Sequence, residues 1–188
     1  MLKFFMKNFL GMSLALTLIV CPGCSFFKPK KNIVQPPPPV ILNGKIIQKE
    51  RVARGGRLLI APFSPGETVE ANAEFERVSL MIVKGVIETL QRQETPFTVL
   101  DDATAHTADL VLKGRMLRMQ ERRVFTSWFR KKTVGKLSVE GMMIDRDTGD
   151  VLVRFSADKS GADDAGKFDA LGYAVGRDIG QLLLSELK

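Results

Sequence analysis

Cysteine and histidine are almost absent from this chain. Its 188 residues include two cysteines and one histidine. Both cysteines, Cys21 and Cys24, lie near the N-terminus, so the rest of the chain has no pair that could form a disulfide. A zinc site built from cysteine and histidine ligands is excluded for the same reason. We therefore expect no metal site, and an ordinary hydrophobic core has to stabilise the fold.

Motifs for nucleophilic catalysis and cofactor binding are also missing. His106 lies in a polar segment without a nucleophile elbow nearby, so we expect its ring to be solvated. The glycine-containing segment 161–168 has the position of a phosphate-binding loop, but Phe168 replaces the required hydroxyl and two aspartates would repel phosphate. Those aspartates, Asp163 and Asp164, suit the cap of a following helix. The sequence predicts a protein that is not an enzyme and has no cofactor.

Three aspartates, Asp145, Asp147 and Asp150, fall close enough together to suggest a calcium loop. Such a loop needs glycine at its sixth position, whereas counting from Asp145 puts Gly149 fifth and Asp150 sixth. The residue order therefore favours a tight turn between two strands.

The N-terminus has the pattern of a secretory signal. Lys3 and Lys7 precede an apolar stretch, Phe9–Val20, and small Gly23 follows before Cys24. The apolar stretch is too short to span a bilayer comfortably, since a membrane helix needs about 20 apolar residues. We therefore predict that residues 1–23 are a signal peptide.

A cysteine directly after the cut resembles the lipobox of bacterial lipoproteins. In that family the cysteine thiol and the new amino terminus are acylated, and two or more acyl chains hold firmly to a membrane. The resemblance implies lipidation of Cys24. Ser25 after the cysteine resembles the outer-membrane sorting class, which implies a lipid anchor facing the periplasm. Cleavage before Cys21 is the disfavoured alternative, because bulky Val20 would then stand at the cut.

Composition divides the mature chain into a tether and one domain. Residues 24–54 contain the proline run 36–39, which favours a stiff extended spacer. The apolar residues 40–42 and 46–47 indicate that part of this stretch packs on the domain or forms an edge strand. We predict a single globular domain over residues 55–188, since the length suits one domain.

Hydrophobic periodicity predicts five strands and two long helices in this domain. The helices are expected at 70–91 and 164–187, and the strands at 57–61, 97–100, 108–119, 134–144 and 151–157. This order favours an α/β (α+β) fold with a mixed sheet of about five strands and both helices packed on one face.

Three segments carry a further resemblance: Leu58–Phe63, Ala108–Arg115 and Asp145–Leu152. Together they resemble bacterial lipoproteins with a small α/β domain. This group includes families of unknown function and, more distantly, the curli-secretion lipoprotein, the lipoprotein activators of penicillin-binding proteins and the amino-terminal domain of the Tol-system propeller protein. The resemblance implies a domain that binds or assembles.

Positive charge is concentrated in one window. From Lys113 to Lys136 there are nine basic residues and one acid, Glu121. Basic residues beside aromatic rings suit a membrane interface with anionic lipid, or an acidic protein partner. Export makes nucleic acid an unsuitable partner. The alternative is a solvated strand pair whose rings cover the core. The candidate residues for anionic-surface binding are Arg118, Arg122, Arg123, Trp128, Arg130, Lys131 and Lys132.

Glycines recur at one-turn spacing in the second predicted helix, at Gly172, Gly176 and Gly180. Each costs about 1 kcal/mol of helix stability relative to alanine, so the smooth stripe needs a reason. One alternative is close packing against the first helix, and the other is a face for self-association.

These features predict a lipid-anchored envelope lipoprotein that acts as a non-catalytic accessory or binding module. The membrane, through the lipid, and an envelope protein or anionic lipid are the expected partners. The alternative is a structural subunit that forms a homo-oligomer in an envelope assembly or export complex.

Overall fold

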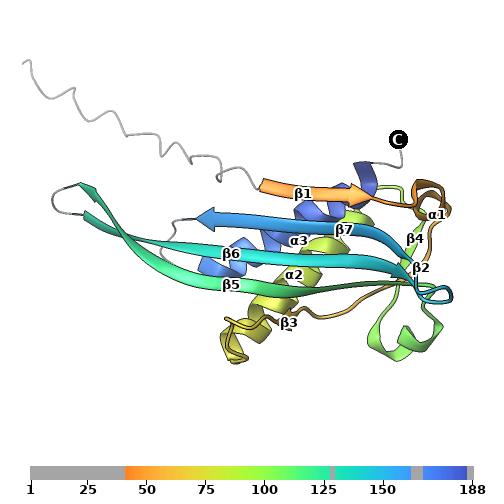
Figure 1. Cartoon of the computed structure of the whole chain (residues 1–188), viewed down its shortest axis with the longest axis horizontal. Coiled ribbons are helices and arrows are strands. Elements are labelled where there is room, and N and C mark those ends of the chain that lie inside the picture. The colour runs from red at the N-terminus through yellow and green to blue at the C-terminus, as the bar shows by residue number, and fades with distance from the viewer. Residues whose placement is uncertain (1–40, 128–129, 162–166, 186–188) are drawn as a thin grey trace, which may run out of the picture. The chain divides into compact units, whose positions relative to one another are not determined.

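The domain is built on one mixed β-sheet. The computed structural model describes residues 41–127, 130–161 and 167–185. The strand order is β1-β7-β6-β5-β2-β4, and short β3 pairs with β5 off this path. Figure 1 shows the strands with the long helices α2 and α3 behind them. The predicted mixed sheet with two long helices on one face is confirmed, with more strands than the sequence pattern predicted.

Three long antiparallel strands form most of the sheet. They are β5 (Leu110–Ser127), β6 (Arg130–Asp145) and β7 (Val151–Gly161). All three extend beyond their predicted bounds. In β5 and β6 the apolar alternation stops where the hairpin leaves the core while backbone pairing continues, and in β7 it is interrupted by Lys159, which is buried. The β5–β6 register extends to Ser127 opposite Arg130.

The remaining central strands are short and parallel. Strand β2 (Gly56–Ile60) pairs in parallel with β5 on one side and with β4 (Phe97–Val99) on the other. Strand β3 (Ser64–Pro65) also pairs in parallel with β5. The 3-10 helix η1 (Asp102–Thr107) connects β4 to β5, and Asp101 caps it by accepting from the Thr104 amide.

Helices α2 (Ala73–Gln91) and α3 (Lys167–Ser185) cover one face of the sheet. Asn72 starts α2 by accepting the Phe75 amide with its side-chain oxygen, which satisfies one free amide of the first turn. The core lies between helices and sheet and contains Val86, Ile179, Leu112 and Met143, all with no exposed surface. Burying apolar side chains of this kind stabilises the fold by about 1.5–3 kcal/mol each.

Residues 41–54 belong to the sheet domain. The predicted boundary, with the tether ending at residue 54 and the domain beginning at 55, is therefore wrong. Strand β1 (Ile41–Ile46) pairs antiparallel with β7 over its whole length. Helix α1 (Lys49–Arg54) follows, and its Val52 is buried in the core. The edge-strand alternative is the one observed. The pattern was weak because Gly44 interrupts the apolar series, and a side chain there would collide with Leu182 of α3.

Candidate functional site: the open sheet face and its arm

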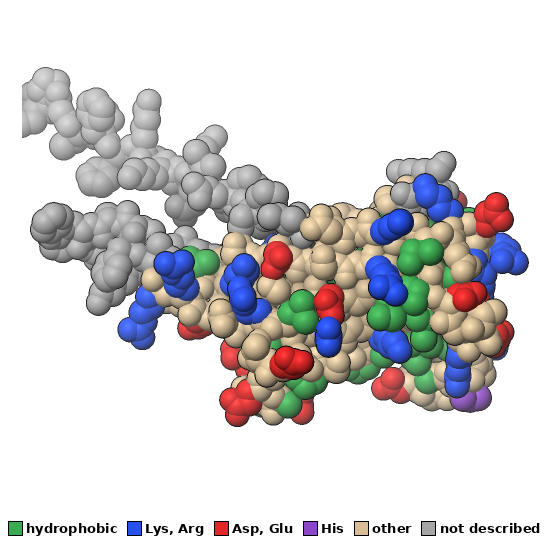
Figure 2. All heavy atoms as spheres, viewed as in Figure 1, with side chains coloured by type: hydrophobic (Ala, Val, Ile, Leu, Met, Phe, Trp, Pro, Cys, Tyr) green, Lys and Arg blue, Asp and Glu red, His purple; other side chains and the backbone are tan. Residues whose placement is uncertain are grey.

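One face of the sheet lacks a helix layer and carries basic side chains. Strand alternation points Met143 and Val153 toward the helices and their neighbours Met142 and Arg154 to the opposite side. We call this second side the open face. Figure 2 shows basic side chains spread across it, with hydrophobic side chains between them. Its exposed cations are Lys45, Lys113, Arg115, Arg118, Arg122, Lys136 and Arg154.

The β5–β6 hairpin continues beyond the rest of the sheet as an arm. Strand β7 ends at Gly161, opposite Gly135, so residues 122–127 and 130–134 pair only with each other among the described residues. Figure 1 shows this ribbon projecting past the helices. Of the cations predicted for anionic-surface binding, Arg122 and Arg123 lie on the arm and are exposed. Arg118 lies at its base, opposite Ser138.

The remaining predicted residues are at the arm's tip. Arg130, Lys131 and Lys132 belong to β6, so the backbone brings them into register with the last residues of β5. Trp128 lies outside the described residues. The basic window is therefore divided between the open face and the arm.

One row of the open face places three cations across the strands. The register aligns Lys113 of β5 with Met142 of β6, Met142 with Arg154 of β7, and Arg154 with Lys45 of β1. We call Lys113, Met142, Arg154 and Lys45 the cation row. Its three cations are exposed, and none forms an ion pair with another described residue. Directly opposed like charges on neighbouring strands destabilise a sheet, so the Lys45–Arg154 pair is unfavourable in the free domain.

A groove of about 570 Å³ lies over this part of the open face. Lys113, Arg115 and Arg154 line it together with Glu140, and Met142 contributes an apolar surface. Arg115 Nε donates to Glu140 Oε1 over 2.5 Å, so one of the three cations is already neutralised. The groove therefore keeps an excess of positive charge from Lys113 and Arg154.

A backbone irregularity forms the rim of the groove. Ile60 pairs with Leu112, and Ser64 pairs with Arg115, so the β2–β3 connection contains one residue more than β5 over the same distance. An extra residue of this kind bends the strand away from its partner. Pro62 and Ser64 in this connection line the groove, and the Ser64 hydroxyl donates to the Gly114 carbonyl oxygen at 3.3 Å.

The glycine stripe of α3 packs against α2. A Cβ atom added at Gly176 would lie 2.0 Å from the Ile82 carbonyl oxygen, and one at Gly172 would lie 2.9 Å from the Val78 carbonyl oxygen. Gly180 faces Thr89 of α2 at 2.7 Å in the same construction. Packing inside the domain is thus the alternative that the structure shows. The alternative prediction, self-association through these glycines, is wrong because α2 occupies their surface.

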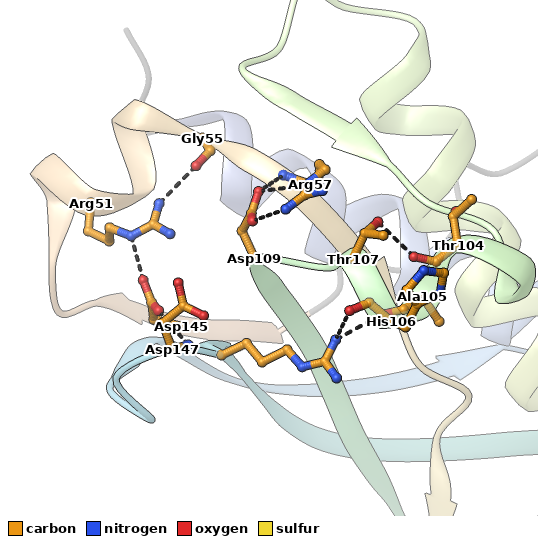
Figure 3. A network of polar contacts seen from close by, with 11 residues as sticks. Arg51, Gly55, Arg57, Thr104, Ala105, His106, Thr107, Asp109, Asp145 and Asp147 are labelled. Carbon is orange, nitrogen blue, oxygen red and sulfur yellow. Dashed lines mark hydrogen bonds and ion pairs between the residues drawn. The ribbon is translucent and has the colours of Figure 1, made fainter.

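A network of polar contacts lies at the end of the sheet opposite the arm (Figure 3). Arg51 of α1 donates to Asp145 Oδ2 at 2.5 Å and to the Gly55 carbonyl oxygen at 2.8 Å. Arg57 donates two hydrogen bonds to the Asp109 carboxylate, from Nη2 to Oδ1 at 2.7 Å and from Nε to Oδ2 at 3.1 Å. The Arg57 hydrogen bonds lower the pKa of Asp109 to about 2.

The predicted turn at Asp145–Asp150 belongs to this network. Burial alone would raise the pKa of Asp145, but Arg51 and the amides of Thr148 and Asp147 outweigh it and lower the pKa. Gly149 adopts φ 77°, the left-handed conformation that a tight hairpin turn requires. No group of three possible metal-ligating side chains occurs within residues 41–127, 130–161 and 167–185.

The predicted anchor, Cys24, lies outside the described residues, as do Asp163 and Asp164 of the expected helix cap. Among the helices that the structure describes, none has the length and apolarity to cross a membrane. His106 is exposed in η1, and its carbonyl oxygen accepts a hydrogen bond from Arg146 at 2.9 Å.

No known family model matches this sequence, and no curated protein matches it. Similar solved structures include the PelC dodecamer from Paraburkholderia phytofirmans, 13% identical, with a TM-score of 0.47 over 79% of this chain and 96% of that one. Lipoprotein GNA1162 from Neisseria meningitidis is 14% identical, with a TM-score of 0.43 over 66% of this chain and 98% of the other.

A putative lipoprotein from Caulobacter crescentus is 13% identical, with a TM-score of 0.43 over 74% of this chain and 93% of that protein. Bacterial lipoproteins are thus among the structural neighbours of this chain. The more distant resemblance to curli-secretion and penicillin-binding-protein-activator lipoproteins stays a prediction. Because these TM-scores are below 0.5, the function of this chain has to be inferred from its own residues.

Sequence reasoning missed Lys45 and Arg154 as members of the candidate site. Both lie outside the basic window, on strands that are far apart in the chain. The alternation in β7 does predict that Arg154 faces away from the core. Its neighbours across the sheet, however, depend on strand order and register, which local periodicity does not encode.

Proposed function

We propose that this protein is a lipid-anchored lipoprotein of the outer membrane, facing the periplasm, whose domain is a non-catalytic accessory module that binds an anionic partner. The anchor is the lipidated Cys24. The observation that supports the binding role most strongly is the open sheet face, which is basic and continues into the arm.

Anionic lipid headgroups are the proposed partner of the arm. The arm presents exposed Arg122 and Arg123 beyond the helix layer, away from the core that stabilises the domain. Each basic side chain near an anionic membrane surface contributes about 1 kcal/mol to binding, and this attraction is screened by salt. The proposed lipid anchor would bring the domain to a surface that carries such headgroups.

Vesicle binding of the unlipidated domain tests this role. The domain should sediment with vesicles that contain phosphatidylglycerol and not with vesicles of phosphatidylcholine alone, and salt should release it. The double variant Arg122→Glu/Arg123→Glu should bind several-fold more weakly. The control Arg92→Glu/Lys84→Glu, at the C-cap of α2 and within it, reverses the same amount of charge away from the arm and should bind as wild type does. Vesicle binding that does not weaken with added salt, or an equal loss of vesicle binding in both double variants, would contradict the proposal.

Oligomerisation is the second candidate function, and the edge of β1 favours it. Strand β1 ends the strand order, so among the described residues its six-residue outer edge has no paired strand. Open strand edges are templates for pairing with another chain. Light scattering on the domain tests this: a concentration-dependent increase in mass supports the subunit role, and a monomer at all concentrations contradicts it.

A further inference from the structure

The cation row points to a site for a small ligand rather than to a diffuse basic surface. Lys113, Arg154 and Lys45 lie in one line across β5, β7 and β1, separated only by Met142 of β6. Neighbouring strands are about 4.8 Å apart, so the Cα atoms of Lys113 and Arg154 are about 10 Å apart. Long side chains at that separation can reach one ligand placed above Met142.

The charge arrangement is unfavourable without an anion. Arg154 and Lys45 are directly opposed, with Cβ atoms about 4.5–5.5 Å apart in such a pair. The nearest acid on the face, Glu140, already pairs with Arg115. A sheet that keeps two facing cations without a carboxylate between them gives up stability, which is the behaviour expected of a binding site.

The groove has the size and lining of a small-molecule site. Its volume of about 570 Å³ falls within the range of about 300–1,000 Å³ that ligand sites occupy. Its lining includes two cations of the row, Lys113 and Arg154, together with Ser64 and the apolar surfaces of Met142 and Pro62. This combination suits a ligand with a compact, multiply charged anionic head and an uncharged remainder.

We propose that the groove binds a ligand carrying a diphosphate group, held by Lys113 and Arg154 with Lys45 at the margin. A diphosphate offers several acceptor oxygens and enough negative charge for three cations, and Arg154 can contact phosphate in the bidentate manner of guanidinium groups. This inference rests on the proposed binding role of the open face but uses a different set of residues from the arm.

Inorganic pyrophosphate is the probe, titrated calorimetrically into the full mature chain in non-ionic detergent. Arg154→Gln should weaken binding by roughly tenfold or more, because hydrogen bonds to charged groups contribute about 1.5–3 kcal/mol each. The control Lys136→Gln removes an equal charge from the same face, in the row of Gln120 and Ser160, and should change affinity less than about twofold. Glu140→Gln should strengthen binding, since it frees Arg115.

Stability provides a second, independent readout. Arg154→Gln should unfold at the same urea concentration as wild type or a higher one, because it removes the like-charge pair with Lys45. A variant that loses the ligand while keeping or gaining stability identifies a binding residue. A lower unfolding midpoint together with unchanged pyrophosphate affinity would overturn the assignment.

Two further experiments separate the possible outcomes. The unlipidated domain is then mixed with zwitterionic vesicles that contain a prenyl diphosphate. A membrane-borne diphosphate would retain wild type but not Arg154→Gln on these vesicles, whereas a soluble diphosphate ligand would show only as binding of free pyrophosphate. Arg122→Glu/Arg123→Glu should bind pyrophosphate with wild-type affinity. The proposal that the arm binds lipid and the proposal that the groove binds a diphosphate can therefore fail separately. No binding of pyrophosphate at millimolar concentration, or equal losses in Arg154→Gln and Lys136→Gln, overturns the proposal.

Discussion

Lys159 is a buried charge within the core, and it shows how single residues constrain this domain. Its side chain on β7 is 3% exposed, and its Nζ atom lies 3.7 Å from Asp178 Oδ2 of α3. That distance allows an ion pair but exceeds a hydrogen bond, so Asp178 Oδ2 has no hydrogen-bond partner among the described residues. Burial lowers the pKa of Lys159, while Asp178 partly opposes the shift.

Breaking this pair should destabilise the domain. Asp178→Asn leaves the Lys159 ammonium buried without its counter-charge, and we expect a loss of about 3 kcal/mol in the free energy of unfolding. The double variant Lys159→Met/Asp178→Asn removes both charges and should return close to wild type. Urea unfolding of the three proteins measures this. Equal stability of Asp178→Asn and wild type would show that the pair is solvated and energetically unimportant.

Asp109 makes the stability of the domain sensitive to acid. Its pKa is about 2 in the folded protein, against an ordinary value of 3.8. A lowered carboxyl pKa means that the unfolded chain takes up the proton first, so the stabilisation is complete above about pH 4. It is lost as pH falls from about 4 to about 2. Asp145, whose pKa is also lowered, acts in the same direction.

Thermal unfolding across this pH window tests the role of Asp109. Wild type should lose stability as pH falls from about 4 toward 2, and Asp109→Asn should lose less over the same window. Asp102→Asn is the matched control, because Asp102 is exposed in η1, whereas the carboxylate that Arg57 contacts is that of Asp109. A slope identical in wild type and Asp109→Asn would refute the stabilising contact.

At the scale of elements, the close approach of α2 and α3 determines how the helix layer covers the sheet. Gly85 of α2 and Gly176 of α3 sit at the crossing, and a Cβ at Gly85 would lie 2.3 Å from the Tyr173 carbonyl oxygen. Backbone atoms on both sides leave no room to adjust. The helical stability that these glycines cost is offset by the packing that they permit.

Gly176→Ala should therefore destabilise the domain, although alanine is the better helix former. A methyl group 2.0 Å from a carbonyl oxygen forces the helices apart, and overpacking of this kind costs about 1–3 kcal/mol or more. Ala170→Leu adds bulk to the same helix at an exposed position and should change stability little. Chemical unfolding compares them. A Gly176→Ala protein that is as stable as wild type would mean that the helices do not meet at this position.

Most elements were predictable because each carries its own periodicity. The apolar stripes of α2 and α3 gave both helices to within about three residues, and alternation predicted the core part of β5, β6 and β7. The arm had no such signal, because a ribbon without a core face needs no alternation. Strand β1 was ambiguous for a similar reason, since its Gly44 makes room for Leu182.

The candidate site was predictable only in part. A charge count along the chain found Arg118, Arg122 and Arg123, since they are neighbours in sequence. The cation row joins Lys45, Lys113 and Arg154, which come together only through the antiparallel pairing of β1 with β7 and of β6 with β5 and β7. Composition cannot reveal a set that depends on register.

At the scale of the whole molecule, the two sides of the domain have different tasks. The helix layer supplies the core that stabilises the sheet, and the open face remains available with its basic side chains exposed. The polar network around Asp145 and Asp109 holds one end of the sheet, while the arm extends from the other. In the proposed account, lipid at Cys24 keeps this open face in the envelope, where anionic groups are abundant.

The most direct test of this account is photo-crosslinking in intact cells. A photoreactive amino acid replaces Ser156, an exposed position on the open face, or Leu80, which is 56% exposed on α2. Both variants carry the native Cys24, and acylation is verified by mass spectrometry. The account predicts crosslinked products from position 156 that charge reversal at Arg154 diminishes, and few from position 80. Equal crosslinking at both positions, or capture through the helix layer alone, would contradict it.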